Sequence, residues 1–121
     1  PVNGVYKLVE IDGIPVMKQT SGKVSYPGKK QIFREFVEGQ LKSDTLGLFS
    51  ENYPGKQPLL KLFMKDGKPL EPSCTIKSIR KRTVASVTSL PPQILNLDSP
   101  KSMEVEISVP LQKLTEKIKK D

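Results

Sequence analysis

Residues 4–35 read GVYKLVEIDGIPVMKQTSGKVSYPGKKQIFRE, and the rest of the chain is organised around this stretch. Two runs rich in β-branched and aromatic residues flank Asp12-Gly13, which predicts a tight β-hairpin because glycine accepts a positive φ at the turn. Pro15 places the second run at a sheet edge, where its missing N–H costs no hydrogen bond. Four lysines lie just after the hairpin or in the following loop: Lys18, Lys23, Lys29 and Lys30. Such a basic loop suits a phosphate or another anion, and a plain solvated loop is the alternative.

The composition indicates one basic domain. The chain has 121 residues, of which 36% are hydrophobic, enough for a modest core. Twenty Lys and Arg residues against 13 Asp and Glu residues give a formal net charge of +7. This balance favours phosphates, nucleic acid or acidic protein surfaces as partners, and does not choose among them.

Cysteine and histidine usage excludes several kinds of site. Cys74 is the single cysteine, so an internal disulfide and a cysteine-based zinc site are excluded, and a reduced, cytoplasmic setting fits. The chain has no histidine, which removes Ser-His and Cys-His nucleophile pairs. No apolar run approaches the roughly 20 residues of a transmembrane helix. Because the chain begins with Pro1 rather than Met, we expect it to be a piece of a longer protein.

Downstream of the hairpin, residue patterns predict further strands. They cover residues 31–37, 40–49, 59–65 and 103–109. Glu38-Gly39 and Asp66-Gly67 are predicted turns, and Gly47 is expected to bend the strand that contains it.

Two helices are predicted in the second half. Ser73 is the expected N-cap of the first, whose apolar face has residues at spacings of three and four: Ile76, Ile79, Thr83, Val87 and Leu90. Ser108 is the expected N-cap of the second, with Pro110 near its first position and an apolar stripe of Leu111, Leu114 and Ile118. The predicted fold class is α+β, a mainly antiparallel sheet of short strands with two helices packed on one side, in a single domain over residues 1–121.

No catalytic constellation or metal site is visible. The carboxylates of the middle of the chain are scattered and form no acid–base pair: Glu35, Glu38, Asp44 and Glu51. No Gly-x-Gly-x-x-Gly loop and no Walker pattern occurs. The residues therefore predict a basic α+β domain with no catalytic constellation of its own.

Three motifs carry a resemblance to a known family. They are GVYKLV at residues 4–9, PVMK at residues 15–18 and PGKKQIFR at residues 27–34. In this order, and followed by the Leu-Pro-Pro break and the final Leu-x-x-Leu helix, they resemble the C-terminal part of nicotinate phosphoribosyltransferase. The resemblance extends over essentially the whole chain.

The resemblance implies part of an enzyme of NAD biosynthesis. That family joins nicotinate to phosphoribosyl pyrophosphate, giving nicotinate mononucleotide and pyrophosphate. The parent enzyme uses ATP and Mg, coupled through a phosphorylated histidine, and has the type II phosphoribosyltransferase fold with active sites at a homodimer interface. Since this chain has no histidine and no Gly-rich phosphate loop, we expect it to be inactive alone and to hold no cofactor itself.

Residue roles carry over for the loop lysines only. Lys18 matches a lysine that, in relatives, points toward the phosphates of phosphoribosyl pyrophosphate or ATP across the dimer interface. Lys23, Lys29 and Lys30 are looser matches in the same loop. The alternative is a basic, non-catalytic binding module for RNA or an acidic protein. The chain lacks a known nucleic-acid-binding signature, which counts against RNA binding.

Overall fold

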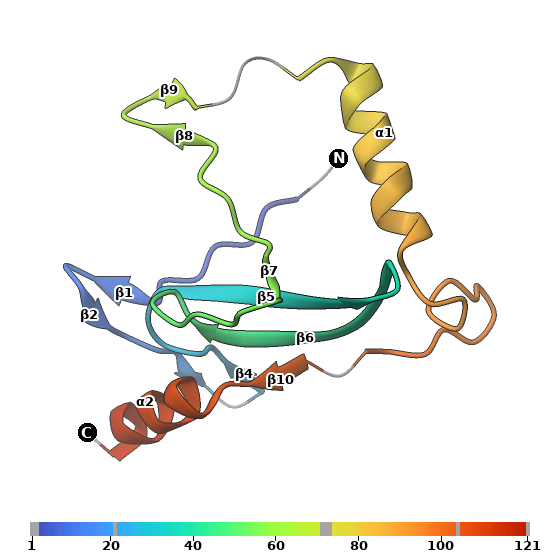
Figure 1. Cartoon of the computed structure of the whole chain (residues 1–121). Helices are drawn as coiled ribbons and strands as arrows, with labels where there is room; N and C mark the ends of the chain where they lie inside the picture. Colours follow the sequence, from blue (N-terminus) through green and yellow to red (C-terminus); the bar gives the residue numbers. More distant parts are fainter. Residues whose placement is uncertain (1–2, 21, 71–73, 104, 121) are drawn as a thin grey trace.

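A long antiparallel hairpin lies at the centre of the molecule (Figure 1). The computed structural model describes residues 3–20, 22–70, 74–103 and 105–120. Strand β5 (Lys30–Val37) pairs with β6 (Gln40–Leu48) along its whole length. The turn at Glu38 and Gly39 has φ values of 50° and 79°, the two-residue geometry that matches the twist of the flanking strands. The strands predicted over 31–37 and 40–49 are confirmed, as is their turn.

One short strand extends the sheet on each side of the hairpin. Strand β7 (Gln57–Pro58) pairs antiparallel with β5, and β10 (Val105–Ile107) pairs parallel with β6, giving the order β10-β6-β5-β7. The parallel pair is possible because residues 49–104 make a long crossover between β6 and β10. The fold class α+β, with two helices and mostly antiparallel strands, is confirmed.

Helix α2 (Val109–Lys120) packs against β6 and closes a small core. Among the described residues, the buried hydrophobic side chains are Phe33, Leu41 and Leu111. Leu114 and Ile118 are half-buried beside Leu111, so the predicted apolar stripe is confirmed.

Three small hairpins lie outside the central sheet. They are β1 (Glu10–Ile11) with β2 (Ile14–Pro15), β3 (Gln19–Thr20) with β4 (Lys23–Val24), and β8 (Met64–Lys65) with β9 (Lys68–Pro69). The predicted turns at Asp12-Gly13 and Asp66-Gly67 are confirmed, with positive φ at each of these residues. The long strand predicted over 59–65 was wrong, because within it only Met64 and Lys65 form a strand.

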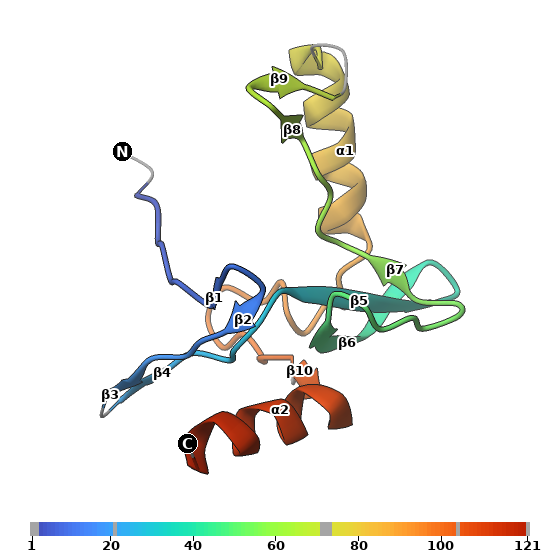
Figure 2. The same cartoon turned by 90° about the vertical axis from the view of Figure 1, so that its left-hand side faces the viewer.

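Helix α1 (Ile76–Thr88) projects away from the sheet (Figures 1 and 2). The Thr75 side chain caps it by accepting a hydrogen bond from the Ser78 N–H, at 3.2 Å. Ser73, our expected N-cap, lies outside the described residues. All 13 residues of α1 are exposed, so the expectation that both helices pack on one side of the sheet was wrong. The spacing of its apolar residues specified a face, but the partner of that face is not found in the described parts of this chain.

The carboxylate of Glu51 joins the end of β6 to the start of α2. It accepts hydrogen bonds from the Leu48 N–H, from the Tyr53 hydroxyl at 2.8 Å and from the Ser108 hydroxyl at 2.7 Å. Ser108 in turn accepts the Leu111 N–H at 3.2 Å, which confirms it as the N-cap of α2.

Gly47 makes room for this carboxylate. A Cβ on Gly47 would lie 2.9 Å from the Glu51 Oε1 atom. Strand β6 runs through Gly47, where we expected a bend, and the irregularity in pairing falls instead between Glu35 and Phe36 of β5. A side chain at position 47 would therefore displace the Glu51 carboxylate.

The N-cap supplied by Ser108 leads to a first prediction. We expect Ser108→Ala to lower the free energy of unfolding of the 121-residue chain by about 1–2 kcal/mol, because it removes the cap and one bond to Glu51. Urea denaturation followed by circular dichroism measures this change. Ser50→Ala, at an exposed position two residues after β6, is the control and should change stability by less than about 0.5 kcal/mol. Equal losses in the two variants would contradict the capping role.

The pH dependence of stability should report Glu51. Burial alone would raise its pKa, but hydrogen bonds from Ser108, the Leu48 N–H and Tyr53 outweigh burial and lower the pKa. A depressed carboxyl pKa stabilises the fold above the unfolded value of about 4.3, and this contribution disappears as pH falls through the folded pKa. We therefore expect Glu51→Gln to be less stable than the unmodified chain at pH 7, with a gap that closes below about pH 4. Urea midpoints measured between pH 7 and pH 3 test this, and a gap independent of pH would refute it.

Candidate anion-binding surface

The Val9 carbonyl brings the basic loop against the first hairpin. Its oxygen accepts the Val16 N–H at 2.9 Å and the Gly28 N–H at 2.7 Å. Gly28 has a φ of +74°, and a Cβ there would contact Leu114 at 3.4 Å. A larger residue at Gly28 would therefore strain the turn and press against α2.

Ser25 fixes the backbone of Lys18. The buried Ser25 hydroxyl accepts the Lys18 N–H at 3.0 Å, and the Ser25 N–H donates to the Lys18 carbonyl at 3.3 Å. Lys18 is itself exposed. The geometry thus holds its backbone in place and leaves its side chain to solvent.

Two hollows adjoin at Lys7 and Ser25. The first, here the Lys18 hollow, has a volume of about 520 Å³, with Lys7 and Lys18 beside an apolar lining of Leu8, Ile11, Val16 and Met17. The second, here the Lys29 hollow, has a volume of about 480 Å³ and is lined by Lys7, Val9, Ser25, Tyr26, Lys29, Lys30 and Leu60. Neither lining includes a carboxylate. Four lysines therefore border two connected depressions, a distribution that attracts anions.

Lys29 and Lys30 differ in what their ammonium groups do. The Lys29 Nζ atom lies 4.2 Å from the centroid of the Phe49 ring, which is a cation–π contact. Lys29 is itself exposed. The Lys30 Nζ atom donates to the Tyr26 carbonyl at 2.7 Å and to the Gly28 carbonyl at 2.6 Å. Burial lowers the Lys30 pKa, and the nearby Glu10 charge partly offsets that effect. Lys30 therefore closes the Tyr26–Gly28 turn, and Lys29 has its charge at the surface.

The structure groups three of the four predicted lysines and adds a fifth lysine. Lys18, Lys29 and Lys30 line the two hollows, whereas Lys23 is described only by its backbone in β4. Lys7 lines both hollows, and the sequence pattern predicted no role for it. Its position within an apolar run of the first predicted strand offered no signal, because only the tertiary fold brings that run beside the basic loop.

The carboxylates in the middle of the chain serve structural contacts. Asp44 holds Arg34 through two hydrogen bonds of 2.7 and 2.9 Å, which raise the Arg34 pKa. Glu35 accepts the Ser43 hydroxyl at 3.0 Å and lies 3.7 Å from Lys56. Among the described residues, no three His, Cys, Asp or Glu side chains gather as metal ligands. These carboxylates are therefore engaged in holding the sheet together.

Fold and surface together define the chain as an α+β domain with lysines around two surface hollows. The profile described as "Nicotinate phosphoribosyltransferase C-terminal domain" matches residues 51–115. The chain therefore belongs to the nicotinate phosphoribosyltransferase family, as the C-terminal domain of that family.

Three comparisons place it within the family. The chain is 40% identical over 94 residues to a nicotinate phosphoribosyltransferase of Mycobacterium tuberculosis, covering 77% of this chain and 20% of that protein. It is 32% identical to the Rattus norvegicus enzyme, covering 94% of this chain and 26% of that protein. The crystal structure of human nicotinic acid phosphoribosyltransferase superposes with a TM-score of 0.82 at 30% identity, over 94% of this chain and 26% of that chain. The chain thus spans only about a fifth to a quarter of the length of these relatives.

No helix in the described parts of the chain is long and apolar enough to cross a membrane.

The contrast between Lys29 and Lys30 can be measured. We expect Lys30→Ala to lower the free energy of unfolding of the chain by about 1–2 kcal/mol, because two carbonyls lose a charged donor. Lys29→Ala removes the same charge at the neighbouring position and should cost less than about 1 kcal/mol, the value of an exposed cation–π contact. Urea denaturation of both variants gives the comparison. A larger loss for Lys29→Ala would show that Lys30 does not hold the turn.

Proposed function

We propose that this chain forms the C-terminal α+β part of a nicotinate phosphoribosyltransferase. That enzyme would make nicotinate mononucleotide from nicotinate and phosphoribosyl pyrophosphate with ATP and Mg, a step of NAD biosynthesis in the cytoplasm. The observation that carries the proposal is the superposition on the human enzyme, at a TM-score of 0.82 over 94% of this chain. The 40% identity to the Mycobacterium tuberculosis enzyme supports it independently.

Within that enzyme, the basic surface would contribute phosphate contacts. Lys18 and Lys29 are the direct candidates, because both are exposed and border hollows whose linings contain no carboxylate. Lys30 would position the loop that carries them through its bonds to Tyr26 and Gly28. Lys23 is proposed as a further phosphate ligand on the basis of the sequence resemblance alone.

The rest of the enzyme would supply the missing chemistry. The chain has no histidine to be phosphorylated, and the carboxylates of Glu35, Asp44 and Glu51 are bound in structural contacts. We therefore assign it a supporting role in fold, in phosphate binding and in the contact between subunits of a homodimer.

A chimaeric enzyme tests this function. The segment of the Mycobacterium tuberculosis enzyme that aligns with this chain is replaced by residues 1–121, and nicotinate mononucleotide formation is assayed with nicotinate, phosphoribosyl pyrophosphate, ATP and Mg. We expect activity in the chimaera and none above background in the 121-residue chain alone. An inactive chimaera that folds, or turnover by the chain alone, would refute the proposal.

The same chimaera tests Lys18. A lysine hydrogen bond to phosphate contributes about 1.5–3 kcal/mol, so Lys18→Ala should lower kcat/KM for phosphoribosyl pyrophosphate or ATP about ten- to hundredfold. Lys113→Ala, which removes the same charge from an exposed position on α2, is the matched control and should leave kcat/KM within about twofold. Equal kinetics for the two variants would remove Lys18 from the site.

A further inference from the structure

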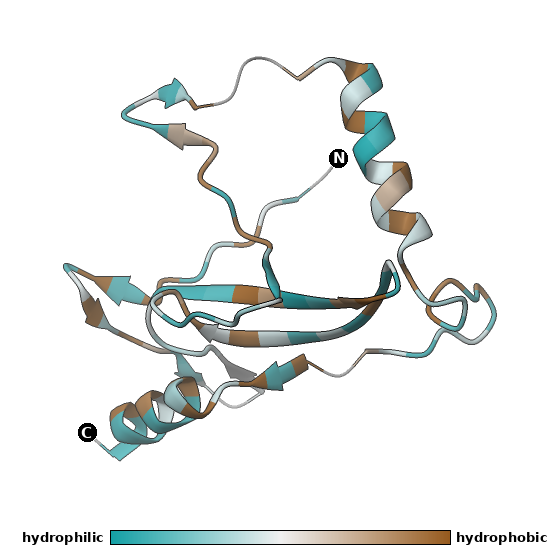
Figure 3. Cartoon of the chain, viewed as in Figure 1, coloured by the Kyte–Doolittle hydropathy of each residue, from teal (hydrophilic) through white to brown (hydrophobic). Residues whose placement is uncertain are grey.

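Helix α1 presents an apolar face that no described part of this chain covers. Ile76, Ile79, Thr83 and Val87 recur on one side, and the exposed fractions of Ile76 and Val87 are 86% and 46%. Figure 3 shows hydrophobic residues along this helix and along the segment that leads into β8. A helix of this length is marginal in water without a packing partner. The apolar pattern therefore indicates that another protein surface packs against this face of α1.

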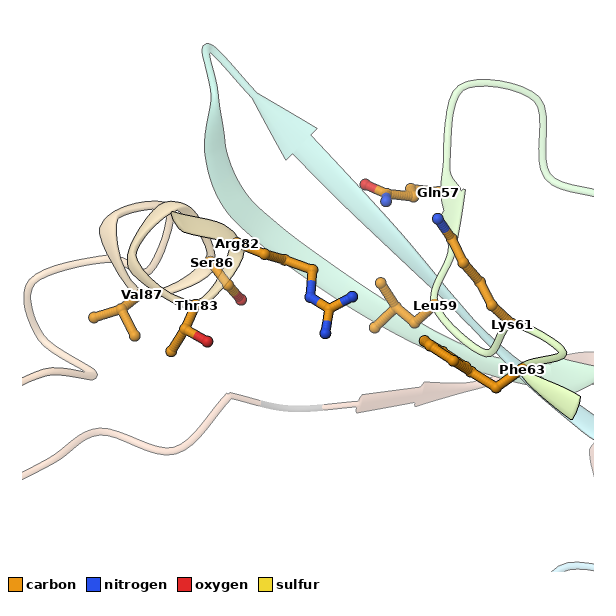
Figure 4. Close-up of a pocket in the computed structure, with 8 residues that line it drawn as sticks. All are labelled: Gln57, Leu59, Lys61, Phe63, Arg82, Thr83, Ser86 and Val87. Atoms are coloured by element: carbon orange, nitrogen blue, oxygen red, sulfur yellow. The ribbon is translucent and has the colours of Figure 1, made fainter. Parts of the chain in front are cut away.

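A groove lies between α1 and residues 57–63, here called the α1 groove (Figure 4). Its volume is about 460 Å³. Leu59, Phe63 and Val87 supply its apolar part, and Gln57, Lys61, Arg82, Thr83 and Ser86 supply its polar part. Figure 4 shows the Arg82 side chain extending from the helix toward Leu59 and Phe63.

The Leu59 wall of the groove is anchored to the central sheet, and α1 is anchored at one end. The Leu59 N–H donates to the Ile32 carbonyl at 2.9 Å. The Leu41 N–H donates to the Ser89 carbonyl, just after α1, at 2.8 Å. The two walls are thus placed by the sheet, while the space between them stays open.

The groove is positively charged. Arg82 and Lys61 line it, and the described salt bridges involve neither residue. Helix α1 contains Lys77, Arg80, Lys81 and Arg82 and no acidic residue. A segment that combines an apolar side chain with a carboxylate complements both features of the groove.

The comparison with the human structure indicates where such a segment comes from. That crystal structure has a similar fold over 94% of this chain, with a TM-score of 0.82, yet this chain accounts for only 26% of its length. A polypeptide segment, unlike a small molecule, would also bury the length of the α1 face. We propose that the α1 groove binds an acidic segment from the part of the same enzyme subunit that lies outside these 121 residues, with an apolar side chain seated against Leu59 and Phe63. This inference rests on the proposed function.

Hydrogen–deuterium exchange on the active chimaera described above, with the 121-residue chain for comparison, tests the proposal. We expect amides of residues 76–88 to exchange at least tenfold more slowly in the chimaera than in the 121-residue chain. The double variant Lys61→Glu/Arg82→Glu should remove most of that protection, because the groove then repels a carboxylate. Lys77→Glu/Lys81→Glu makes the same charge change on the opposite side of α1, and should leave protection within about twofold.

Each contrary outcome has a distinct meaning. Equal exchange in the chimaera and the 121-residue chain, or equal effects of the two double variants, would overturn the proposal. Protection that disappears on dilution, together with dissociation of subunits in sedimentation, would show that a second subunit fills the groove and would also overturn it. An inactive chimaera with protected α1 amides would refute the proposed function but not the groove assignment. An active chimaera with unprotected α1 amides would refute the groove assignment but not the proposed function.

Discussion

The carboxylate of Glu51 is the interaction on which the body of the molecule depends. It binds the last amide of β6, the Tyr53 hydroxyl and the Ser108 cap of α2, so one side chain joins the sheet, the following loop and the C-terminal helix. Because few hydrophobic side chains are buried among the described residues, polar contacts of this kind have a larger share in positioning α2 than they would in a domain with a large core. The absence of a side chain on Gly47 allows the carboxylate to approach β6 closely. The Glu51 contacts therefore hold the β5–β6 hairpin, helix α2 and the loop that contains Tyr53 together as one structural unit.

The basic surface rests on that unit. Gly28 turns against Leu114 of α2, and the Val9 carbonyl ties this turn to the first hairpin. Lys30 uses its charge to close the turn, and this leaves Lys18 and Lys29 exposed beside Lys7. The lysines thus differ in role: the Lys30 ammonium group binds backbone carbonyls, whereas Lys18 and Lys29 are exposed to solvent.

Helix α1 is a second kind of structure, an arm that leaves the sheet (Figure 2). The arm is amphipathic and carries positive charge, yet all residues of α1 are exposed. Natural helices gain most of their stability from packing one face against another element. The contrast between a closed body and an open arm fits a chain that spans about a quarter of its mammalian relative.

The sequence by itself determined the local elements: the glycine turns at positions 13, 39 and 67, the strands β5 and β6, the Ser108 cap and the apolar stripes of both helices. These follow from backbone preferences and side-chain periodicity, which act over a few residues. The sequence also determined the family, because the motifs and their order can be recognised without knowing which residues are in contact. Only the tertiary structure decided that β10 pairs parallel with β6, that residues 59–63 do not pair as a strand, that α1 has no partner in the described chain, and that Lys7 joins the basic loop. Each of these features depends on which segments, distant in the sequence, come into contact. A residue pattern indicates that a face must be covered, but it does not identify the segment that covers it.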